Sequence, residues 1–467
     1  MTRFIIPILA FACAFSSCSE DESKATSLPQ IHLTCDEEEL NPGDYQVGDL
    51  TWHDTLGKKV WDEKIRLRSR GNRSATFEKH SFALKLSEAY EMLELPENKK
   101  FKLNAEYIDK TFMRNKLSYD LFRSFSPGNY APHVEYCVVY MNKKYQGIYA
   151  MTESVDASTL QLTKGDKGAV LFKEPPVSYP PDEHADRFAK FKKYVQRSVR
   201  YKDYSIKARY KLEDECYFNQ RYPDLKKENC SDEIYRVTEF IFNTTDAEFS
   251  NPKRFKKYFD LNNLIDWHLL ILVTANGDGT YKNFYMSRKE SGEPYIFTPW
   301  DYDHSFGRDG DGEPSKLSII PVKDNMALLH RLMETNAFNY RQKLYEKYRS
   351  LQKSGLLTDK NIHRMIDANV AVLKSEIKDN EKRWPPGAMK YFKNATFDTE
   401  VQRMKNWITN HLPNLEEYLR EQSELPTPEK KAEQLVLPPD FPNLILTSTV
   451  QMLEEMEDLT DSIKTPN

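Results

Sequence analysis

Alternating apolar and polar positions mark strands in the first third of the chain. Trp61 to Arg68 alternates in this way, and so does Ser81 to Leu86. This period of two is typical of half-buried strands. Tyr136 to Met141 and Tyr145 to Thr152 predict a further strand pair joined by a short turn, and Gly168 to Lys173 continues the sheet.

A buried helix followed by a hairpin is predicted in the middle of the chain. Apolar residues recur at helical spacing after Asp260, a candidate N-cap, and Asn276-Gly277 ends the segment. Two short strands follow, Phe284 to Ser287 and Tyr295 to Pro299. Glu290-Ser291-Gly292 between them is a good hairpin turn.

Other segments have apolar residues at helical spacing and are predicted to be helices. Tyr107 to Ser124 has an apolar face, with Asp109 as a candidate cap. The chain over 182–250 is charged, aromatic-rich and mainly helical, and Met326 to Glu424 is also helical. We therefore expect an α+β fold, strand-rich before about residue 175 and mostly helical after it. Pro426 to Pro442 is proline-rich and predicts a linker.

The N-terminus predicts export. Arg3 precedes an apolar run from Phe4 to Phe15, which is shorter than the roughly 20 residues that span a bilayer. A basic start and a short apolar core are typical of a secretory signal. Ser16-Ser17-Cys18 resembles a bacterial lipobox, so Cys18 would carry a lipid, although plain signal cleavage is the alternative. The polar run from Ser19 to Lys24 would then be a tether.

Composition narrows the class of protein. Charged residues make up 30% of the chain and the mean hydropathy is −0.72, so we expect attachment to a membrane only through the N-terminal lipid. The net charge of −4 includes no dominant basic stripe, which argues against nucleic-acid binding. Four cysteines remain after the signal. Cys216 and Cys230 would form the local disulfide, or all four are free thiols.

Polar residues on either side of the hairpin are candidates for phosphoryl transfer. Asp278 and Asn283 precede its first strand, and Asp301 and Asp303 follow its second. Protein kinases place their catalytic loop and metal-binding Asp in this order of elements. The reaction requires oxygen ligands for Mg²⁺ and an acceptor for the hydroxyl proton. Asp278 would orient or deprotonate the hydroxyl, while Asn283, Asp301 and Asp303 would hold metal.

Two other interpretations fit the same residues. Asp, Asn and Gly favour turns for backbone reasons, so these residues could be turn and capping groups. Asp301, Asp303, Asp309 and Asp311 also crowd together as in a structural calcium loop. An EF-hand loop beginning at Asp301 would need Gly at its sixth position, where Phe306 stands, so that motif is excluded.

Several motifs occur in a fixed order along the chain: Arg70-Gly71-Asn72-Arg73-Ser74, Lys79 to Lys85, Asp109 to Asn115, Asn142 to Tyr149 with Glu153, Leu171-Phe172-Lys173 and Asp278 to Gly307. Together they resemble the CotH (spore coat protein H) kinase-like family over roughly residues 45 to 423. The resemblance implies a divergent two-lobed protein-kinase-like fold. It also implies binding of ATP with Mg²⁺ or Mn²⁺, and phosphorylation of Ser or Thr in exported or envelope proteins.

Together with the N-terminal signal and the proline-rich segment, the resemblance predicts a domain organisation. A lipoprotein signal and a tether with a leading strand would precede the kinase-like domain, and a linker with a tail helix would follow it. The expected bounds are 1–18 for the signal, 19–44 for the tether and strand, 45–423 for the domain (N-lobe 45–175, helical insert 182–250, C-lobe 251–423) and 424–467 for the linker and tail. Such a protein would lie in the bacterial cell envelope, anchored to the outer membrane.

A kinase-like site needs a lysine on the phosphates, usually positioned by a glutamate. Lys85 and Lys173 stand at strand positions suited to this role, and Glu153 is the natural partner. Arg70-Gly71-Asn72 would cover the phosphates with backbone N–H groups and a guanidinium. The alternatives are ordinary strand lysines and a plain hairpin turn.

The chain departs from ordinary kinases in two respects. It has no G-x-G-x-x-G loop, and Gly277 stands before Asp278 where a His-Arg-Asp motif would place Arg. A transferase of AMP, or one that activates glutamate with ATP, would use the same metal ligands. An inactive surface lipoprotein that binds a partner or a glycan is the non-enzymatic alternative.

Overall fold

The computed structural model describes residues 25–36, 40, 43–71, 73–175, 177, 220–225, 227–280, 282–309, 313–314, 327–388 and 394–427. No helix within these ranges is long and apolar enough to cross a membrane. Cys137 and Cys230 are free thiols. Cys18, Asn72, Asp311, Cys216, most of the predicted insert and the predicted tail helix lie outside the described residues.

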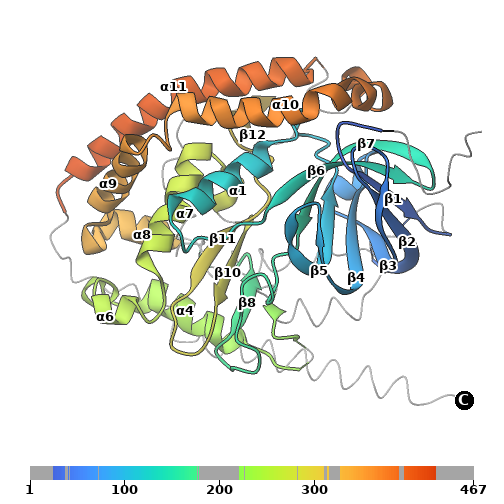
Figure 1. Cartoon of the computed structure of the whole chain (residues 1–467). Coiled ribbons are helices and arrows are strands. Elements are labelled where there is room, and N and C mark those ends of the chain that lie inside the picture. The colour runs from blue at the N-terminus through green and yellow to red at the C-terminus, as the bar shows by residue number, and fades with distance from the viewer. Residues whose placement is uncertain are drawn as a thin grey trace, which may run out of the picture.

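Seven strands close into a barrel, seen on the right of Figure 1. Neighbouring strands are antiparallel except for the first and sixth, which pair in parallel and close the ring. The strands, in their order around the barrel, are β1 (Gln30–Thr34), β2 (Gln46–His53), β3 (Lys59–Arg70), β4 (Ser81–Met92), β5 (Leu95–Asn104), β7 (Lys144–Glu153) and β6 (Val134–Met141).

The alternating pattern explains the two faces of the barrel wall. Apolar residues at every second position, such as Leu67, Leu84 and Phe101, fill one buried core inside the ring. Between them, basic residues such as Arg66 and Lys85 lie on the outer face. The strands predicted within β3, β4, β6 and β7 are confirmed.

The predicted two-lobed kinase-like fold is wrong. The N-terminal sheet is a closed barrel, because β1 pairs with β2 on one side and with β6 on the other. A closed sheet has no free edges, so this part of the chain is not an open-sheeted lobe. The alternation identified which residues face the core, but it did not reveal that the two ends of the sheet meet.

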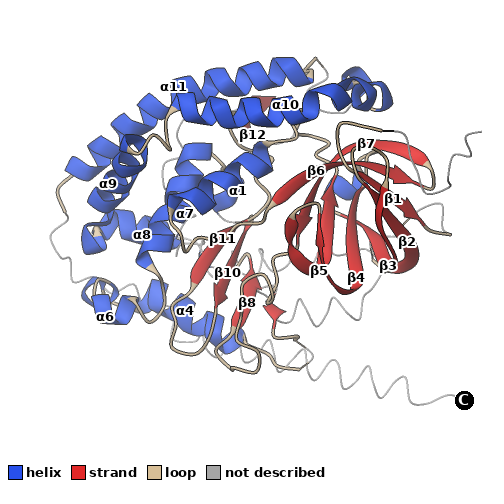
Figure 2. Ribbon diagram, viewed as in Figure 1, coloured by secondary structure: helices blue, strands red, loops and turns tan. Residues whose placement is uncertain are grey.

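A second sheet stands between the barrel and the helices (Figure 2). Its four strands are all antiparallel. In order they are β11 (Ile296–Pro299), β10 (Phe284–Arg288), β8 (Val170–Lys173) and β9 (Gln220–Tyr222). The predicted hairpin is therefore confirmed as β10–β11, and its turn contains Gly292 with φ 89°.

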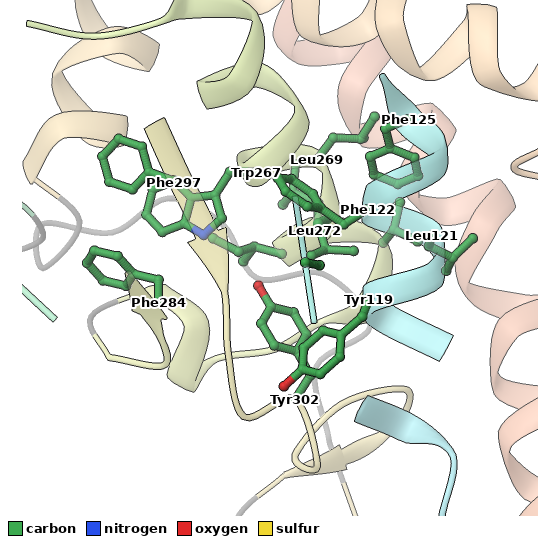
Figure 3. Close-up of a cluster of buried hydrophobic side chains, with 14 of the residues drawn as sticks. Tyr119, Leu121, Phe122, Phe125, Trp267, Leu269, Leu272, Phe284, Phe297 and Tyr302 are labelled. Atoms are coloured by element: carbon green, nitrogen blue, oxygen red, sulfur yellow. The ribbon is translucent and has the colours of Figure 1, made fainter. Parts of the chain in front are cut away.

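Helix α7 (Leu261–Thr274) is buried along nearly its whole length. The Asp260 side chain caps it by accepting from the main-chain N–H of Asn263, and Ala275 ends it in a left-handed conformation, so the sequence prediction is confirmed. Trp267 stacks on Phe297 of the second sheet, with ring centroids 4.5 Å apart (Figure 3). This packing fixes the hairpin relative to α7.

Some of the remaining helices pack on α7, and one packs on β7 of the barrel (Figure 1). Helix α1 (Arg114–Phe125) begins later than predicted, because the Asp109 carboxylate accepts from the main-chain N–H groups of Thr111 and Arg114 and holds a turn there. The other elements are α4 (Ser231–Asn243), α5 (Asp246–Phe249), α6 (Pro252–Phe255), α8 (Ala327–Thr335), α9 (Tyr340–Lys353), α10 (Asp359–Arg383), α11 (Phe397–Glu424), β12 (Arg308–Asp309) and β13 (Glu313–Pro314).

Candidate functional site

The β10–β11 hairpin places Asn283 beside Asp301. The Asn283 side-chain amide donates to the main-chain carbonyl of Asp301 at 2.8 Å, and the main-chain N–H of Trp300 donates to the carbonyl of Asn283 at 2.9 Å. Because the amide N–H is used in this bond, the Asn283 side-chain oxygen is the atom left to meet a cation. The Asp301 side chain belongs to an exposed residue. Two candidate oxygen ligands, Asn283 and Asp301, are therefore neighbours at the end of the hairpin.

Asp278 lies within reach of the loop that carries Asp301. It begins a short 3-10 turn after α7, where its carboxylate is 2.9 Å from the Lys282 ammonium and 3.5 Å from His304 Nδ1. The main-chain N–H of Phe306 donates to the carbonyl of Thr274 at 2.7 Å, which ties the loop to the end of α7. The loop and the turn thus form one polar site.

The ionisable groups in this site shift one another's pKa values. Burial and the neighbouring Asp301 carboxylate raise the pKa of Asp303. Burial alone would lower the pKa of His304, but the carboxylates of Asp303 and Asp278 raise it overall. His304 therefore carries positive charge near neutral pH and partly offsets the surrounding carboxylates.

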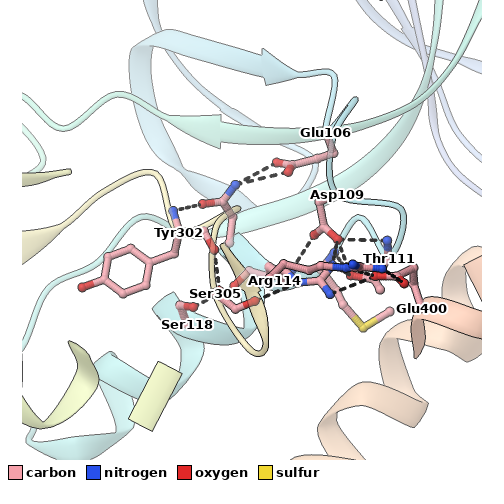
Figure 4. A network of polar contacts seen from close by, with 11 residues as sticks. Glu106, Asp109, Thr111, Arg114, Ser118, Tyr302, Ser305 and Glu400 are labelled. Carbon is pink, nitrogen blue, oxygen red and sulfur yellow. Dashed lines mark hydrogen bonds and ion pairs between the residues drawn. The ribbon is translucent and has the colours of Figure 1, made fainter. Parts of the chain in front are cut away.

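Helix α1 holds the main chain of the Asp301 loop (Figure 4). The N–H of Tyr302 donates to the Asn115 side-chain oxygen at 2.6 Å, and the N–H of Asp301 donates to the Tyr119 hydroxyl at 2.9 Å. The Asn115 amide in turn donates to both carboxyl oxygens of buried Glu106, each at 3.2 Å. Sequence reasoning placed Asn115 in a motif but assigned no role to Asn115, Tyr119 or Glu106, because their partners are distant along the chain.

Arg114 fixes the far end of the same loop. Its side chain is 1% exposed, and its Nε donates to the carbonyl of Ser305 at 3.0 Å. Its guanidinium also pairs with Asp109 and, at 3.4 Å, with Glu400 of α11. The loop is therefore held at both ends by α1.

Basic side chains gather around Trp300, next to Asp301. The Lys102 ammonium lies 3.7 Å from the centre of the Trp300 ring, and the Arg70 guanidinium lies 5.9 Å from it. Burial, with the nearby cations of Arg70 and Lys173, holds the pKa of Lys102 well below its usual range. A cationic group crowded in this way is suited to bind an anion such as a phosphate.

Lys173 joins this group from the end of β8. Its ammonium is 3.1 Å from Glu174, whose carboxylate accepts from the main-chain N–H of Asn283 at 3.4 Å. Burial would raise the pKa of Glu174, but Lys173 lowers it overall, so Glu174 is ionised. Lys173 is thereby linked to the Asn283–Asp301 pair. Sequence reasoning identified Lys173 but not Glu174 or Lys102.

The structure does not bring Lys85 and Glu153 together. Lys85 is opposite Lys100 on the outer face of the barrel, whereas Glu153 is opposite Phe101, a residue of the barrel core. Glu153 instead accepts from the Tyr130 hydroxyl at 3.1 Å and the main-chain N–H of His133 at 2.9 Å. The two residues face opposite sides of the same wall.

Arg70 and Gly71 have a partly structural role. Arg70 donates to the side chain of Asn104, and Gly71 has φ 126°. A Cβ at Gly71 would lie 2.3 Å from Ser74 Oγ and 2.8 Å from the main-chain nitrogen of Ala75, so only glycine fits there. Arg70 is nevertheless close to Trp300 and so belongs to the basic group described above.

A complete protein-only metal cage is absent from the part of the chain that the structure describes, since no three His, Cys, Asp or Glu side chains are grouped to hold an ion. Magnesium in phosphotransfer sites usually has one or two carboxylates, with phosphate oxygens and water as its other ligands. Asp301 and the Asn283 oxygen fit that smaller donor set.

Comparison with known proteins shows the family of the chain. The family model described as CotH kinase protein matches residues 67–415. The chain belongs to this family. Inner spore coat protein H of Bacillus subtilis (strain 168) is 27% identical over 317 residues, which cover 63% of this chain and 78% of that protein. The resemblance predicted from the sequence motifs is thus confirmed. The CotH region extends from β3 to α11 and includes Arg70, Lys102, Asp278 and Asp301.

Proposed function

We propose that this CotH-family chain transfers the γ-phosphate of ATP, with Mg²⁺ or Mn²⁺, to Ser or Thr of an exported or envelope protein. The observation that carries the proposal is the juxtaposition of Asn283 and Asp301 with a basic group around Trp300. Oxygen ligands for a metal and cations for phosphate oxygens are the two requirements of phosphoryl transfer. The family description, CotH kinase protein, supports the same chemistry.

Each group has a role in this proposal. Asp301 and the Asn283 oxygen would hold the metal, which neutralises charge on the phosphates. Lys102, Lys173 and Arg70 would hold phosphate oxygens, while Asp278 orients the acceptor hydroxyl and receives its proton. The hydroxyl oxygen forms a bond to the γ-phosphorus as the bond to the β-phosphate oxygen breaks, and ADP leaves.

The proposal places the enzyme outside the cytoplasm. Cys18 would carry the lipid that anchors the chain to the cell envelope, and the protein would contact the membrane through that lipid only. Labelling of cells with a radioactive fatty acid tests the anchor. We expect label on the wild-type chain and none on Cys18→Ala. Label on both chains would mean that Cys18 is not the lipidated residue.

The activity is tested with the purified full chain and ATP labelled at either the γ- or the α-phosphate. We expect the γ-label to reach Ser or Thr and the α-label to stay in solution. Asp278→Asn should lower transfer about 10²- to 10⁴-fold without loss of nucleotide binding, a typical effect of losing a general base. Asp301→Asn should also weaken metal-dependent nucleotide binding.

Asp359→Asn, on the first turn of α10, is the matched control and should leave both measurements unchanged. Transfer of the α-label would indicate an AMP transferase instead. Nucleotide binding without transfer of either label would indicate an inactive, binding-only protein. Full activity of both Asp278→Asn and Asp301→Asn would refute the assignment of the site.

A further inference from the structure

The outer wall of the barrel carries a row of basic residues beyond the basic group around Trp300. Arg66 of β3 is directly opposite Lys85 of β4, which is directly opposite Lys100 of β5. Arg68 lies two residues after Arg66 on β3, so its side chain is on the same outer face of the barrel. We name these four residues, Arg66, Arg68, Lys85 and Lys100, the β3–β5 cationic face.

This arrangement opposes folding. Like charges directly opposite on neighbouring strands destabilise a sheet. Lys100 has Asp156 at 3.2 Å, but Arg66 and Lys85 have no ion-pair partner among the described residues. Arg66 and Arg68 instead lie over the Tyr45 ring, at 5.5 and 4.9 Å from its centre. A bound anion would relieve this repulsion.

The cationic face leads directly into the proposed phosphotransfer site. The next outward residues are Arg70 on β3 and Lys102 on β5, and both lie over Trp300 beside Asp301. Outward side chains of a strand repeat about every 7 Å, so Arg66 lies roughly 14 Å from Arg70 along the strand. An extended peptide has the same two-residue repeat, so its alternate side chains can match Arg66, Arg68 and Arg70.

We infer that the β3–β5 cationic face binds an acidic, extended segment of the protein substrate. Asp or Glu at alternate positions, about four to eight residues from the phosphorylated hydroxyl, would meet Arg66, Arg68, Lys85 and Lys100. This inference rests on the proposed function, because it names the substrate class of that same site.

Acidic groups beside the face favour a single chain over a flat anionic membrane. Asp49 of β2 pairs with Lys64 at 3.6 Å on one side, and Asp156 pairs with Lys100 on the other. These carboxylates would repel an anionic membrane that covered the whole wall. A single acidic strand can lie between them.

Binding is measured first, since it does not depend on catalysis. Two fluorescent Ser-containing peptides are compared by anisotropy with the full chain, one with Glu at alternate positions four to eight residues from Ser and one with Gln there. We expect the Glu peptide to bind the wild-type chain more tightly. Arg66→Gln with Lys85→Gln should weaken that binding roughly tenfold, with little change for the Gln peptide.

Lys64→Gln with Lys99→Gln is the matched control. It removes the same charge from the barrel wall, but at residues of β3 and β5 that already pair with Asp49 and Glu88. In the transfer assay, the Arg66/Lys85 variant should raise KM for the Glu peptide roughly tenfold and leave kcat and the KM for ATP unchanged. The control variant should match the wild-type chain.

The outcomes separate the two proposals. Selective binding of the Glu peptide that depends on Arg66 and Lys85, without any transfer, would support the docking surface and refute the kinase activity. Equal binding of both peptides, or equal effects of the two double variants, would overturn the docking surface. Vesicles with phosphatidylglycerol that bind through Arg66 and Lys85, while neither peptide binds, would overturn it in favour of a membrane surface.

Discussion

Asn283 donates from its side chain to the main-chain carbonyl of Asp301 at 2.8 Å, and both residues have a left-handed backbone, with φ 63° and 64°. Asn adopts this conformation more readily than most residues. The bond therefore connects the start of β10 with the end of β11 at the point where both candidate metal ligands stand. It couples the conformation of one ligand to that of the other.

Two substitutions distinguish the contribution of the Asn283 side chain from that of its left-handed backbone. Asn283→Gly removes the amide but tolerates the positive φ, whereas Asn283→Ala removes the amide and adds about 1 kcal/mol of strain. We expect both variants to lose metal-dependent nucleotide binding, and Ala to be the less stable by urea denaturation. Equal nucleotide binding by wild type and Asn283→Gly would contradict a ligand role for the side chain.

Lys102 is expected to hold phosphate. Lys102→Met removes the ammonium that lies 3.7 Å from Trp300, so we expect nucleotide affinity to fall about 10- to 100-fold, as for the loss of a charge-assisted contact of about 1.5–3 kcal/mol. Lys99→Met, at an exposed lysine of the same strand that pairs with Glu88, serves as control. Calorimetric titration with ATP measures both. Similar affinities would place the phosphates elsewhere.

Local signals in the sequence were sufficient for the hairpin and for α7. The cap at Asp260, the turn at Gly292 and the apolar run between Leu264 and Val273 each act over a few residues, and the structure has them as predicted. Because these short-range signals define the helix and the hairpin, they also predict the order of Asp278, Asn283 and Asp301 around the two strands.

Contacts between residues far apart in the chain could not be predicted from the sequence in the same way. Closure of the barrel depends on pairing β1 with β6, about a hundred residues apart, and the spacing of residues does not specify such a contact. For the same reason the sequence pointed to Lys85 and not to Lys102. Both lie on the outer face, but only the three-dimensional arrangement places Trp300 against Lys102. The alternation of Phe101 and Leu103 around Lys102 was the one signal that could have identified it.

Arg114 should contribute strongly to stability, because it pairs with the buried carboxylate of Asp109. Arg114→Met leaves Asp109 without this ion-pair partner, whereas Glu400 keeps its pair with Arg308, and breaking a buried ion pair from one side typically costs about 3–5 kcal/mol. Arg349→Met removes a half-exposed pair with Glu416 and should cost under about 1 kcal/mol. Urea denaturation measures both free energies of unfolding. Equal losses would show that the Arg114 network adds little beyond a surface pair.

Buried Lys79 predicts a pH dependence of stability. Its ammonium donates to the carbonyl of Ala105 at 2.8 Å, and burial lowers its pKa to about 7. The unfolded chain keeps this proton up to a pH of about 10.4. Between these values the unfolded state binds more protons, so the free energy of unfolding should rise with pH by up to about 1.4 kcal/mol per unit. Below pH 7 both states are protonated, so this dependence ends there.

The measurement compares wild type with Lys79→Met by urea denaturation at several pH values from 6 to 9. Lys79→Met should be less stable at the upper end, because the carbonyls of Ala105 and Ile148 lose their donor. The difference between the two proteins should shrink as the pH falls from 9 to 7, since only the wild-type chain then has to bury a charge. Lys374→Met, at an exposed residue of α10, should show no such trend. A constant difference for Lys79→Met across this range would mean that Lys79 keeps its proton in the folded state.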